Sequence, residues 1–359
     1  MTDSHRHPER FGTPDGLAFH GWRLLWFALL FVGFSAAGIW SVYSQVAGHE
    51  LRWDSRLLGY KTLLSSLALL LIYFVADGLR LWFTLRALGH SIRLPDMARL
   101  VALNIFVSNI TPMATGGGVA QVWYLRRRGV PIGIGLAATT IRTALAVVFI
   151  FGATPILLFT LPANAQGVTQ SGSLIMTFSV SVALYLGFFG VLVMRSNWLL
   201  RPMLLALKAT QELRLIQPTR YRRWRKRLVR TLQQFAHGFL LYFQGNRLDI
   251  VASFIFTILF LLALFSFPVL VFWALGYDFD YWLVIIRMVM TTFVMYFSPT
   301  PGASGIAEGV FGYFFRDLVT ASHLVLVTVA WRVLTIYLGM LIGMFVLQQE
   351  IVADRRGQP

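Results

Sequence analysis

Two arginines stand in otherwise apolar sequence, where their guanidinium groups could bind an anion. Arg142 lies in ATTIRTALA and Arg332 lies in TVAWRVLT. A guanidinium group matches a phosphate in charge and in geometry. An arginine inside a membrane costs about 3 kcal/mol or more, so it normally faces the protein interior or water. Each arginine follows a broken apolar stretch by a similar distance, and we expect the pair to hold one phosphate group.

Three more charged side chains in apolar sequence could serve this site or neutralise it. Asp77 and Arg80, in VADGLRLW, are three residues apart and share one face of a helix. Asp77 could pair with Arg80 or Arg142 simply to join helices, and the sequence leaves this structural role open beside the functional one. Arg287, in VIIRMVM, is expected to reach the membrane surface or to pair with Glu308.

Two stretches in which proline and glycine interrupt apolar sequence match each other without a gap. FVSNITPMATGGGVAQ, residues 106–121, aligns with FVMYFSPTPGASGIAE, residues 293–308. Chance could align residues that are common in membrane helices. The match, however, includes helix-breaking proline and glycine positions and the polar residue at the end of each stretch. The sequence therefore favours an internal repeat. The identical pairs are Phe106/Phe293, Val107/Val294, Pro112/Pro299, Gly118/Gly305 and Ala120/Ala307.

Each interrupted stretch predicts a re-entrant helical hairpin, because backbone freed by proline or glycine cannot face lipid. The second half-helix should begin near Gly117 or Ser304, and the positive end of its dipole would suit an anion. Glu308, one turn in, could be an ion or proton site, with Gln121 as its uncharged repeat partner. The expected substrate-binding residues are Arg142, Arg332, Asp77, Arg80, Gln121, Gly117, Gly118, Ser304, Gly305 and Glu308. The expected helix breaks are Pro112, Pro299, Pro301 and Gly302.

The composition indicates the elements that must position these residues. Hydrophobic residues make up 57% of the 359 residues, charged residues 13%, and the mean hydropathy is +0.67. Soluble domains carry about 25% charged residues, so the sequence predicts an all-α polytopic membrane protein. With no cysteine in the chain, disulfides and thiolate chemistry are excluded. The seven histidines are dispersed, with no HExxH motif, and we expect no metal, no cofactor and no enzymatic activity.

The apolar runs predict six full spans, at about 22–43, 61–85, 132–161, 173–194, 250–275 and 321–348. The two re-entrant hairpins are expected at about 95–125 and 282–315. Residues 1–20 are expected to form a disordered N-terminal tail and 351–359 a C-terminal tail, on either side of a single transmembrane domain at 21–350. Three spans separate the hairpins, so they would enter from opposite faces and form an inverted repeat, which is typical of transporters.

The basic residues predict the orientation of the chain. Twelve of the 31 lysines and arginines lie in residues 195–247, and three more form the run 126–128. Cytoplasmic loops carry such an excess, so both segments and both termini should be cytoplasmic in a cell membrane. The segment 195–247 includes an amphipathic stretch that could lie on anionic lipid or could serve only as an orientation signal. This placement argues against nucleic acid as the partner of the +16 charge.

Two motifs give the chain a resemblance to a known family. TPMATGGGVAQVWYLRRRGVP, from Thr111, and SPTPGASGIAEG, from Ser298, resemble the lysylphosphatidylglycerol synthase transmembrane (flippase-like) family, which includes the membrane half of the multiple peptide resistance factor. The resemblance covers about residues 20–350. It implies a flippase or scramblase for anionic phospholipids or polyprenyl-phosphate-linked lipids. Many relatives have an acidic residue where this chain has Gly118.

The resemblance also implies partners and limits. Anionic membrane lipids are expected as partners, and a separate lipid-synthesising enzyme could supply them, since this chain ends at Pro359 without the synthase domain of bifunctional relatives. Residues 21–350 would form the flippase-like domain. A gradient-coupled transporter of a small anionic solute is the alternative, with Glu308 as the coupling site. The sequence leaves the lipid, the direction of transport and the oligomeric state open.

Overall fold

The computed structural model describes residues 54–160 and 218–355, with a few isolated positions elsewhere, and these ranges contain helices and no strands. Several expected elements lie outside the described residues: the N-terminal tail, the spans at 22–43 and 173–194, most of the segment 195–217, and the last residues of the C-terminal tail. The helices below therefore represent four of the six expected spans and both expected hairpins.

Four helical stretches are long and apolar enough to cross a membrane. They are α2 (Tyr60–Ala87), α5 (Ile132–Thr160), α9 (Arg247–Ala274) and a last stretch that joins α12 (Ala321–Arg332), η6 (Val333–Tyr337) and α13 (Leu338–Arg355). At 28 residues, α2 and α9 are each about 40 Å long, which exceeds the roughly 30 Å of hydrocarbon. These four stretches agree with the expected spans.

Both interrupted sequences form a helix, a break and a second helix. The first comprises α3 (Leu94–Ile110), η2 (Pro112–Ala114) and α4 (Thr115–Arg127). The second comprises α10 (Tyr281–Met295), η5 (Pro301–Ala303) and α11 (Ile306–Phe315). Each of these helices is shorter than the roughly 20 residues that a span requires, so a single helix of either hairpin is too short to cross by itself.

The bounds of the helices repeat between two halves of the chain, a first half from α2 to α5 and a second half from α9 to α13. The helices α2 and α9 have the same length, and each is followed by a glycine with positive φ. These are Gly89, at +76°, and Gly276, at +82°. At each end the next residue, His90 or Tyr277, donates a backbone hydrogen bond to a carbonyl in the last turn. A left-handed residue here closes a helix, and glycine adopts it without a Cβ penalty. The similarity between the two halves therefore extends beyond the two motifs, as an internal repeat would require.

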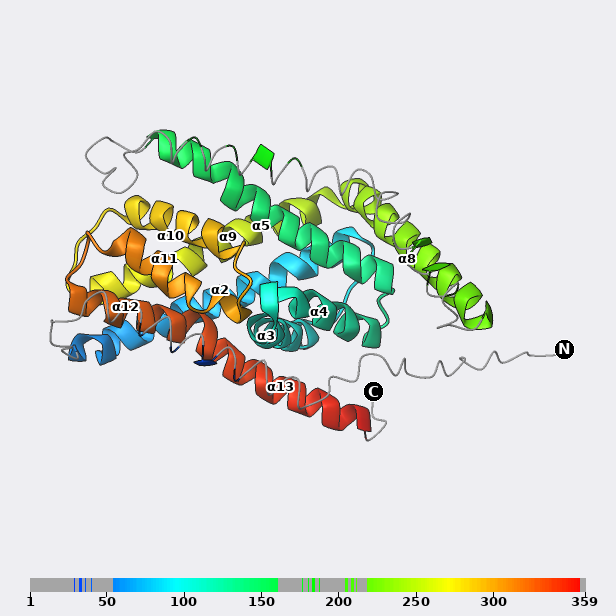
Figure 1. Cartoon of the computed structure of the whole chain (residues 1–359), viewed down its shortest axis with the longest axis horizontal. Helices are drawn as coiled ribbons and strands as arrows, with labels where there is room; N and C mark the ends of the chain where they lie inside the picture. Colours follow the sequence, from blue (N-terminus) through cyan, green and yellow to red (C-terminus); the bar gives the residue numbers. More distant parts are fainter. Residues whose placement is uncertain are drawn as a thin grey trace.

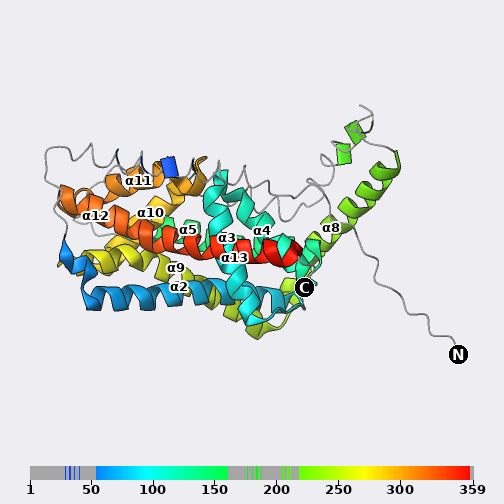
Figure 2. The ribbon, with the colours of Figure 1, turned by 90° about the horizontal axis from the view of Figure 1, so that it is seen from below.

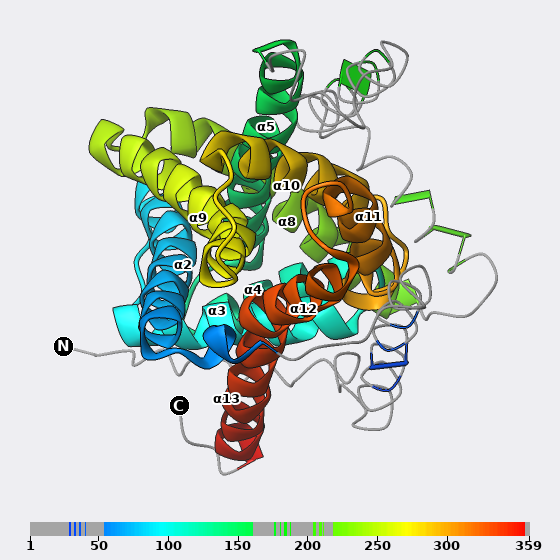
Figure 3. The same cartoon turned by 90° about the vertical axis from the view of Figure 1, so that its left-hand side faces the viewer.

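The repeat-related helices α2 and α9 pack along each other in opposite directions (Figure 3). Gly245, just before α9, lies so close to the end of α2 that a Cβ on it would meet the carbonyl oxygen of Ala87 at 2.2 Å. At the other end Gly276, after α9, lies beside Arg56 in η1 (Ser55–Leu58), which precedes α2. Equivalent helices that run antiparallel are what an inverted repeat requires.

The contacts between the halves are reciprocal. The hairpin helix α3 packs on α13 of the second half, while α10 packs on α5 of the first, and the breaks η2 and η5 contact each other. Figure 1 shows α12 and α13 as one long stretch, and Figure 2 shows α3 crossing its direction. At this crossing a Cβ on Gly343 would lie 2.2 Å from the carbonyl oxygen of Ala102, so glycine lets the two backbones approach.

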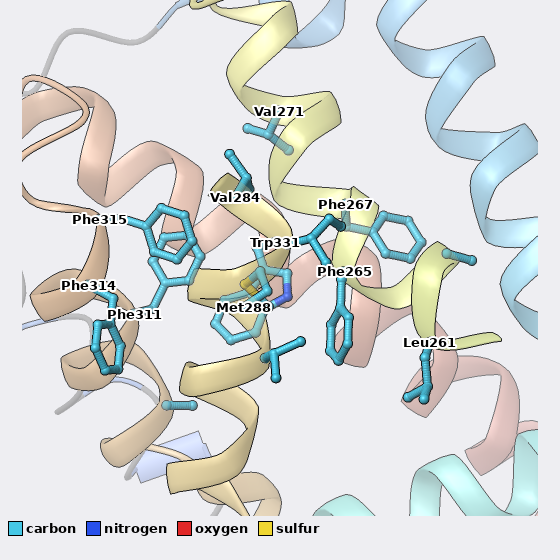
Figure 4. Packing of buried hydrophobic residues seen from close by; sticks show 14 of the residues in the cluster. Leu261, Phe265, Phe267, Val271, Val284, Met288, Phe311, Phe314, Phe315 and Trp331 are labelled. Carbon is cyan, nitrogen blue, oxygen red and sulfur yellow. The ribbon is translucent and has the colours of Figure 1, made fainter. Parts of the chain in front are cut away.

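Aromatic side chains fill the core of the second half (Figure 4). Phe311 of α11 stacks on Phe315 at 4.4 Å and on Trp331 of α12 at 4.8 Å between ring centroids. Phe267 of α9 reaches Tyr73 of α2 at 5.9 Å. This packing fixes α11 and α12 relative to each other. It therefore also positions Glu308, in the first turn of α11, and Arg332, at the end of α12.

The basic amphipathic sequence forms α8 (Pro218–Gln244). Its C-terminal half packs on α5, where Gly238 lies against Ala137 and Gly133 lies against Gln234. The basic side chains at 222, 223 and 225–227 are exposed, and Figure 1 shows this part of α8 extending away from the other helices. The amphipathic helix expected from sequence is confirmed, while its contact with lipid stays a prediction.

Candidate functional site

The two hairpin tips have the same backbone turn, and it includes residues in a left-handed conformation. In η2, Pro112 is followed by Met113 and Ala114, both with φ of +53°. In η5, Pro301 is followed by Gly302 at +58° and Ala303 at +55°. The turn thus aligns Pro112 with Pro301, and the gapless match of Pro112 with Pro299 is wrong at this point. The second copy has two more residues before the turn and two fewer between the turn and the conserved glycine.

Glu308 lies at the start of α11 and its carboxylate closes that end of the helix. The backbone N–H of Gly305 donates to Oε2 at 2.7 Å, which satisfies one of the free donors of the first turn. Arg332 Nε lies 2.7 Å from Oε1. Both side chains are fully buried. The Nε–H does not point along this line, so the contact is ionic without a well-aligned hydrogen bond.

Arg332 also holds the second tip. Its Nη2 donates to the carbonyl oxygen of Gly302 at 3.1 Å, and Nη1 has no partner in the described part of the chain. The helix widens to a π-helix directly after Arg332, over η6, and π-turns of this kind are frequent at functional sites. One guanidinium group therefore connects the last span, the turn η5 and the carboxylate of Glu308.

A second buried cluster joins α2 and α5 in the first half. Asp77 Oδ1 accepts from Arg80 Nε at 2.7 Å and from Arg142 Nη2 at 2.6 Å. The guanidinium group of Arg80 stacks over the ring of Phe260 at 3.6 Å. Arg80 Nη1 and Arg142 Nε have no partner in the described ranges. Two cations thus share one carboxylate, and the three side chains together carry one excess positive charge.

The structure gives Arg142 and Arg332 a carboxylate each, rather than a group in common. Asp77, the partner of Arg142, comes from α2, whereas Glu308, the partner of Arg332, comes from α11 of the second hairpin. The structural role left open for Asp77, pairing with both arginines of its half, is thus present in the fold. Binding of one phosphate by both arginines stays a prediction.

Most of the remaining expected site residues are buried in the fold, and Gly118 borders open space. A Cβ on Gly117 would lie 1.8 Å from Ser108 Oγ, so α3 fills the space beside it, whereas no atom lies within 4 Å of a Cβ on Gly118. Gln121 is buried, and its Nε2 has no partner in the described part. Ser304 is buried and donates to the carbonyl oxygen of Pro301 at 2.7 Å, which places it in the turn itself.

Arg287 does not pair with Glu308. Its guanidinium group binds both carboxylate oxygens of Asp317, in the connection that follows α11, with Nη2 at 2.9 Å from Oδ2. Burial raises the pKa of the Asp317 carboxyl, but the hydrogen bond and charge of Arg287 outweigh it and leave the pKa below its usual value. This side chain fastens α10 to the end of the hairpin.

The comparison with known proteins agrees with this architecture. A family model described as the lysylphosphatidylglycerol synthase transmembrane region matches residues 25–343. The chain belongs to this family. It is also similar to a protein of Archaeoglobus fulgidus described as a UPF0104 membrane protein, with 20% identity over 307 residues that cover 85% of this chain and 92% of the relative.

Membership in the family confirms the resemblance drawn from the two motifs. With the four long apolar helices, it identifies a multi-pass membrane protein and connects the chain with membrane lipids. In the ranges that the structure describes, no three His, Cys, Asp or Glu side chains form a group that could hold a metal ion.

Sequence reasoning missed one charged group in this member of the family. Glu350, near the end of α13, is buried and lies within 4 Å of arginines at the base of the first hairpin. From the sequence, the arginine run 126–128 indicates only the orientation of the chain. A hint was present, because Glu350 stands in a polar end of the last span, yet sequence alone does not show that α13 crosses the first hairpin.

Proposed function

We propose that this chain moves an anionic lipid, a phospholipid or a polyprenyl-phosphate-linked lipid, between the leaflets of a membrane as a flippase or scramblase. The observation that carries the proposal is the excess positive charge of the Asp77, Arg80 and Arg142 cluster. A buried cation without a counter-ion is costly, and an anionic headgroup would neutralise it. Membership in a family connected with membrane lipids supports the same reading.

The hairpins supply the second part of the proposal. Re-entrant hairpins whose tips meet inside the membrane would let a headgroup pass between the repeats while its tails remain in lipid. The helices of each hairpin are too short to span, and η2 contacts η5, which supports this arrangement. Movement of one repeat against the other would give alternating access. In this proposal the protein is a transporter without enzymatic activity and without a cofactor.

The decisive experiment is reconstitution of the purified chain into liposomes with fluorescent lipids. We expect dithionite to quench inner-leaflet label on phosphatidylglycerol much faster than in empty liposomes, and label on phosphatidylcholine no faster. Arg142→Gln should slow the anionic lipid at least tenfold, since one good charged hydrogen bond is worth about 1.5–3 kcal/mol. Equal rates for both lipids in wild type and variant would contradict the proposal.

A gradient-coupled transporter of a small anionic solute is the second candidate. The buried pair of Glu308 and Arg332 favours it, because protonation of Glu308 would release a cation beside the second tip. Uptake of radiolabelled phosphate or a small carboxylate driven by a pH gradient, without lipid movement, would select this alternative.

The proposal includes the orientation and the partners. We place the chain in the cell membrane with both termini cytoplasmic, with α8 on the anionic leaflet and with a separate enzyme as the source of the lipid. The exposed basic side chains of α8 support its placement on the anionic leaflet and the cytoplasmic orientation.

A further inference from the structure

Three arginines at the base of the first hairpin surround one carboxylate of the last helix. Arg99 of α3 lies 3.5 Å from Glu350 through Nη1, Arg127 of α4 lies 3.5 Å away through Nη1, and Arg128 lies 3.7 Å away through Nη2. Glu350 is buried, with 6% of its surface exposed. Two helices of the hairpin therefore direct cations at a single side chain from α13.

The carboxylate of Glu350 is held loosely. Charge-assisted hydrogen bonds between guanidinium and carboxylate groups are about 2.7–2.9 Å long, and all three distances to Glu350 exceed that range. The short contact in this group is a different one, from Arg128 Nη2 to Asp96 at 2.9 Å. Arg127 Nη1 also donates a hydrogen bond to the backbone carbonyl oxygen of Glu350, at 3.4 Å.

Asp96 and Glu350 face the three arginines from distant parts of the chain. Arg128 Nε is buried without a hydrogen-bond partner in the described residues. Aromatic rings support two of the cations, with Trp123 at 5.0 Å from Arg127 and Tyr124 at 5.1 Å from Arg128. A preorganised and partly desolvated group of guanidinium donors is what a phosphate requires, because phosphate accepts bidentate bonds from arginine.

We infer that Arg99, Arg127 and Arg128 form a second anion site, for a phosphate group, and that Glu350 occupies it as an internal counter-ion. Inorganic phosphate carries more charge and more acceptor oxygens than one carboxylate, so it would displace Glu350 and loosen the end of α13 from the hairpin. A lipid phosphodiester carries a single charge, as Glu350 does, and would compete with it for the same donors. The phosphate could belong to a lipid headgroup or to a soluble ion. The inference concerns binding alone and does not depend on the proposed translocation.

The test is thermal unfolding of the purified full chain in nanodiscs of phosphatidylcholine, with inorganic phosphate titrated at constant ionic strength. Glu350→Gln removes the internal competitor. We expect this variant to unfold at a lower temperature without phosphate and to bind phosphate about tenfold or more tightly than wild type. Adding Arg128→Gln to Glu350→Gln should abolish that response.

Asp249→Asn is the matched control. Asp249 is a buried carboxylate at the start of α9 that pairs with one arginine, Arg86, at 3.3 Å, so its loss leaves a single cation and should give no phosphate response. Nanodiscs with phosphatidylglycerol distinguish the two sources, because a response to that lipid without a response to soluble phosphate assigns the site to headgroups. Either response in Glu350→Gln supports the site.

The inference is overturned if Glu350→Gln responds to neither source, or responds no more than Asp249→Asn. The charges would then form only a structural ion-pair network. If Glu350→Gln does not fold, Glu350→Asp retains the charge but shortens the side chain, and it should bind phosphate more tightly than wild type. An unchanged affinity in Glu350→Asp would also refute the site.

Discussion

At the scale of single residues, this chain buries cations and differs between halves in how it neutralises them. The pair of Glu308 and Arg332 is neutral and fully buried, whereas Asp77 faces two arginines, Arg80 and Arg142. Removing one partner of a buried pair leaves an uncompensated charge, while removing both can be nearly neutral. Mutations of one charge and of two should therefore behave very differently.

Glu308→Gln should destabilise the protein by about 3–5 kcal/mol, because it leaves Arg332 buried without its counter-ion. The double variant Glu308→Gln with Arg332→Met should recover most of this loss. Chemical denaturation in detergent, monitored by tryptophan fluorescence, measures both. If the single variant is as stable as the wild type, the carboxylate serves only as the cap of α11.

Arg80→Gln tests the excess charge of the first cluster. It leaves Asp77 and Arg142 as a neutral pair, so we expect a folded protein whose anionic lipid transport falls at least about tenfold. Asp77→Asn removes the only carboxylate of this cluster, and we expect it to lower the unfolding temperature strongly. Normal transport by Arg80→Gln would mean that the excess charge binds no substrate.

At the scale of elements, the two turns η2 and η5 hold residues in a conformation that suits glycine. A left-handed residue other than glycine costs about 1–2 kcal/mol, and Met113, Ala114 and Ala303 all have positive φ. Such strain is common where a segment changes conformation during function. Because the two turns share a backbone but not a sequence, each can be given residues from the other.

Met113→Gly should stabilise the protein by up to about 1 kcal/mol, since the relief of strain exceeds the entropy cost of glycine. Little packing is lost, because Met113 is 64% exposed. The reciprocal change, Gly302→Met, should cost about 1–2 kcal/mol. Both are measured as shifts in unfolding midpoint, and shifts of the same sign would show that backbone strain does not control the tips.

The crossing of α13 over α3 predicts opposite effects for two glycines. Gly343→Ala places a Cβ 2.2 Å from the carbonyl oxygen of Ala102, so the helices must separate, at a cost of about 1–3 kcal/mol. Gly118→Ala meets no atom within 4 Å and should stabilise α4 by up to about 1 kcal/mol. Equal effects of the two changes on thermal stability would contradict the crossing.

Sequence patterns predicted the elements well and their partners poorly. The helix breaks and four spans follow from Pro112, Pro301 and the apolar runs, because breaking residues and hydropathy act locally. The pairing of Glu308 with Arg332, rather than Arg287, depends on which helices meet, and no local signal carries that information. The cluster at Glu350 was missed for the same reason. The offset of two residues at the tip appears only in the backbone angles.

At the scale of the whole molecule, α2 and α9 lie against each other and run in opposite directions. In the proposed orientation, His237 of α8 faces the cytoplasm and Asp278, before α10, faces the outside. The chain contains no cysteine, so a single cysteine can be placed at either exposed position. We expect an impermeant maleimide to label Asp278→Cys in intact cells and His237→Cys only after permeabilisation. Labelling of both in intact cells would overturn the orientation.

The reciprocal contacts between halves also determine when each part of the chain can mature during synthesis. The first hairpin emerges from the ribosome long before α13, the helix on which α3 packs, because α5, α8, α9 and the second hairpin are made between them. Until then, Ala102 and the surface around it have no partner. A nascent chain arrested after α8 should therefore expose the hairpin to quality-control proteases, and supplying the second half as a separate polypeptide should protect it.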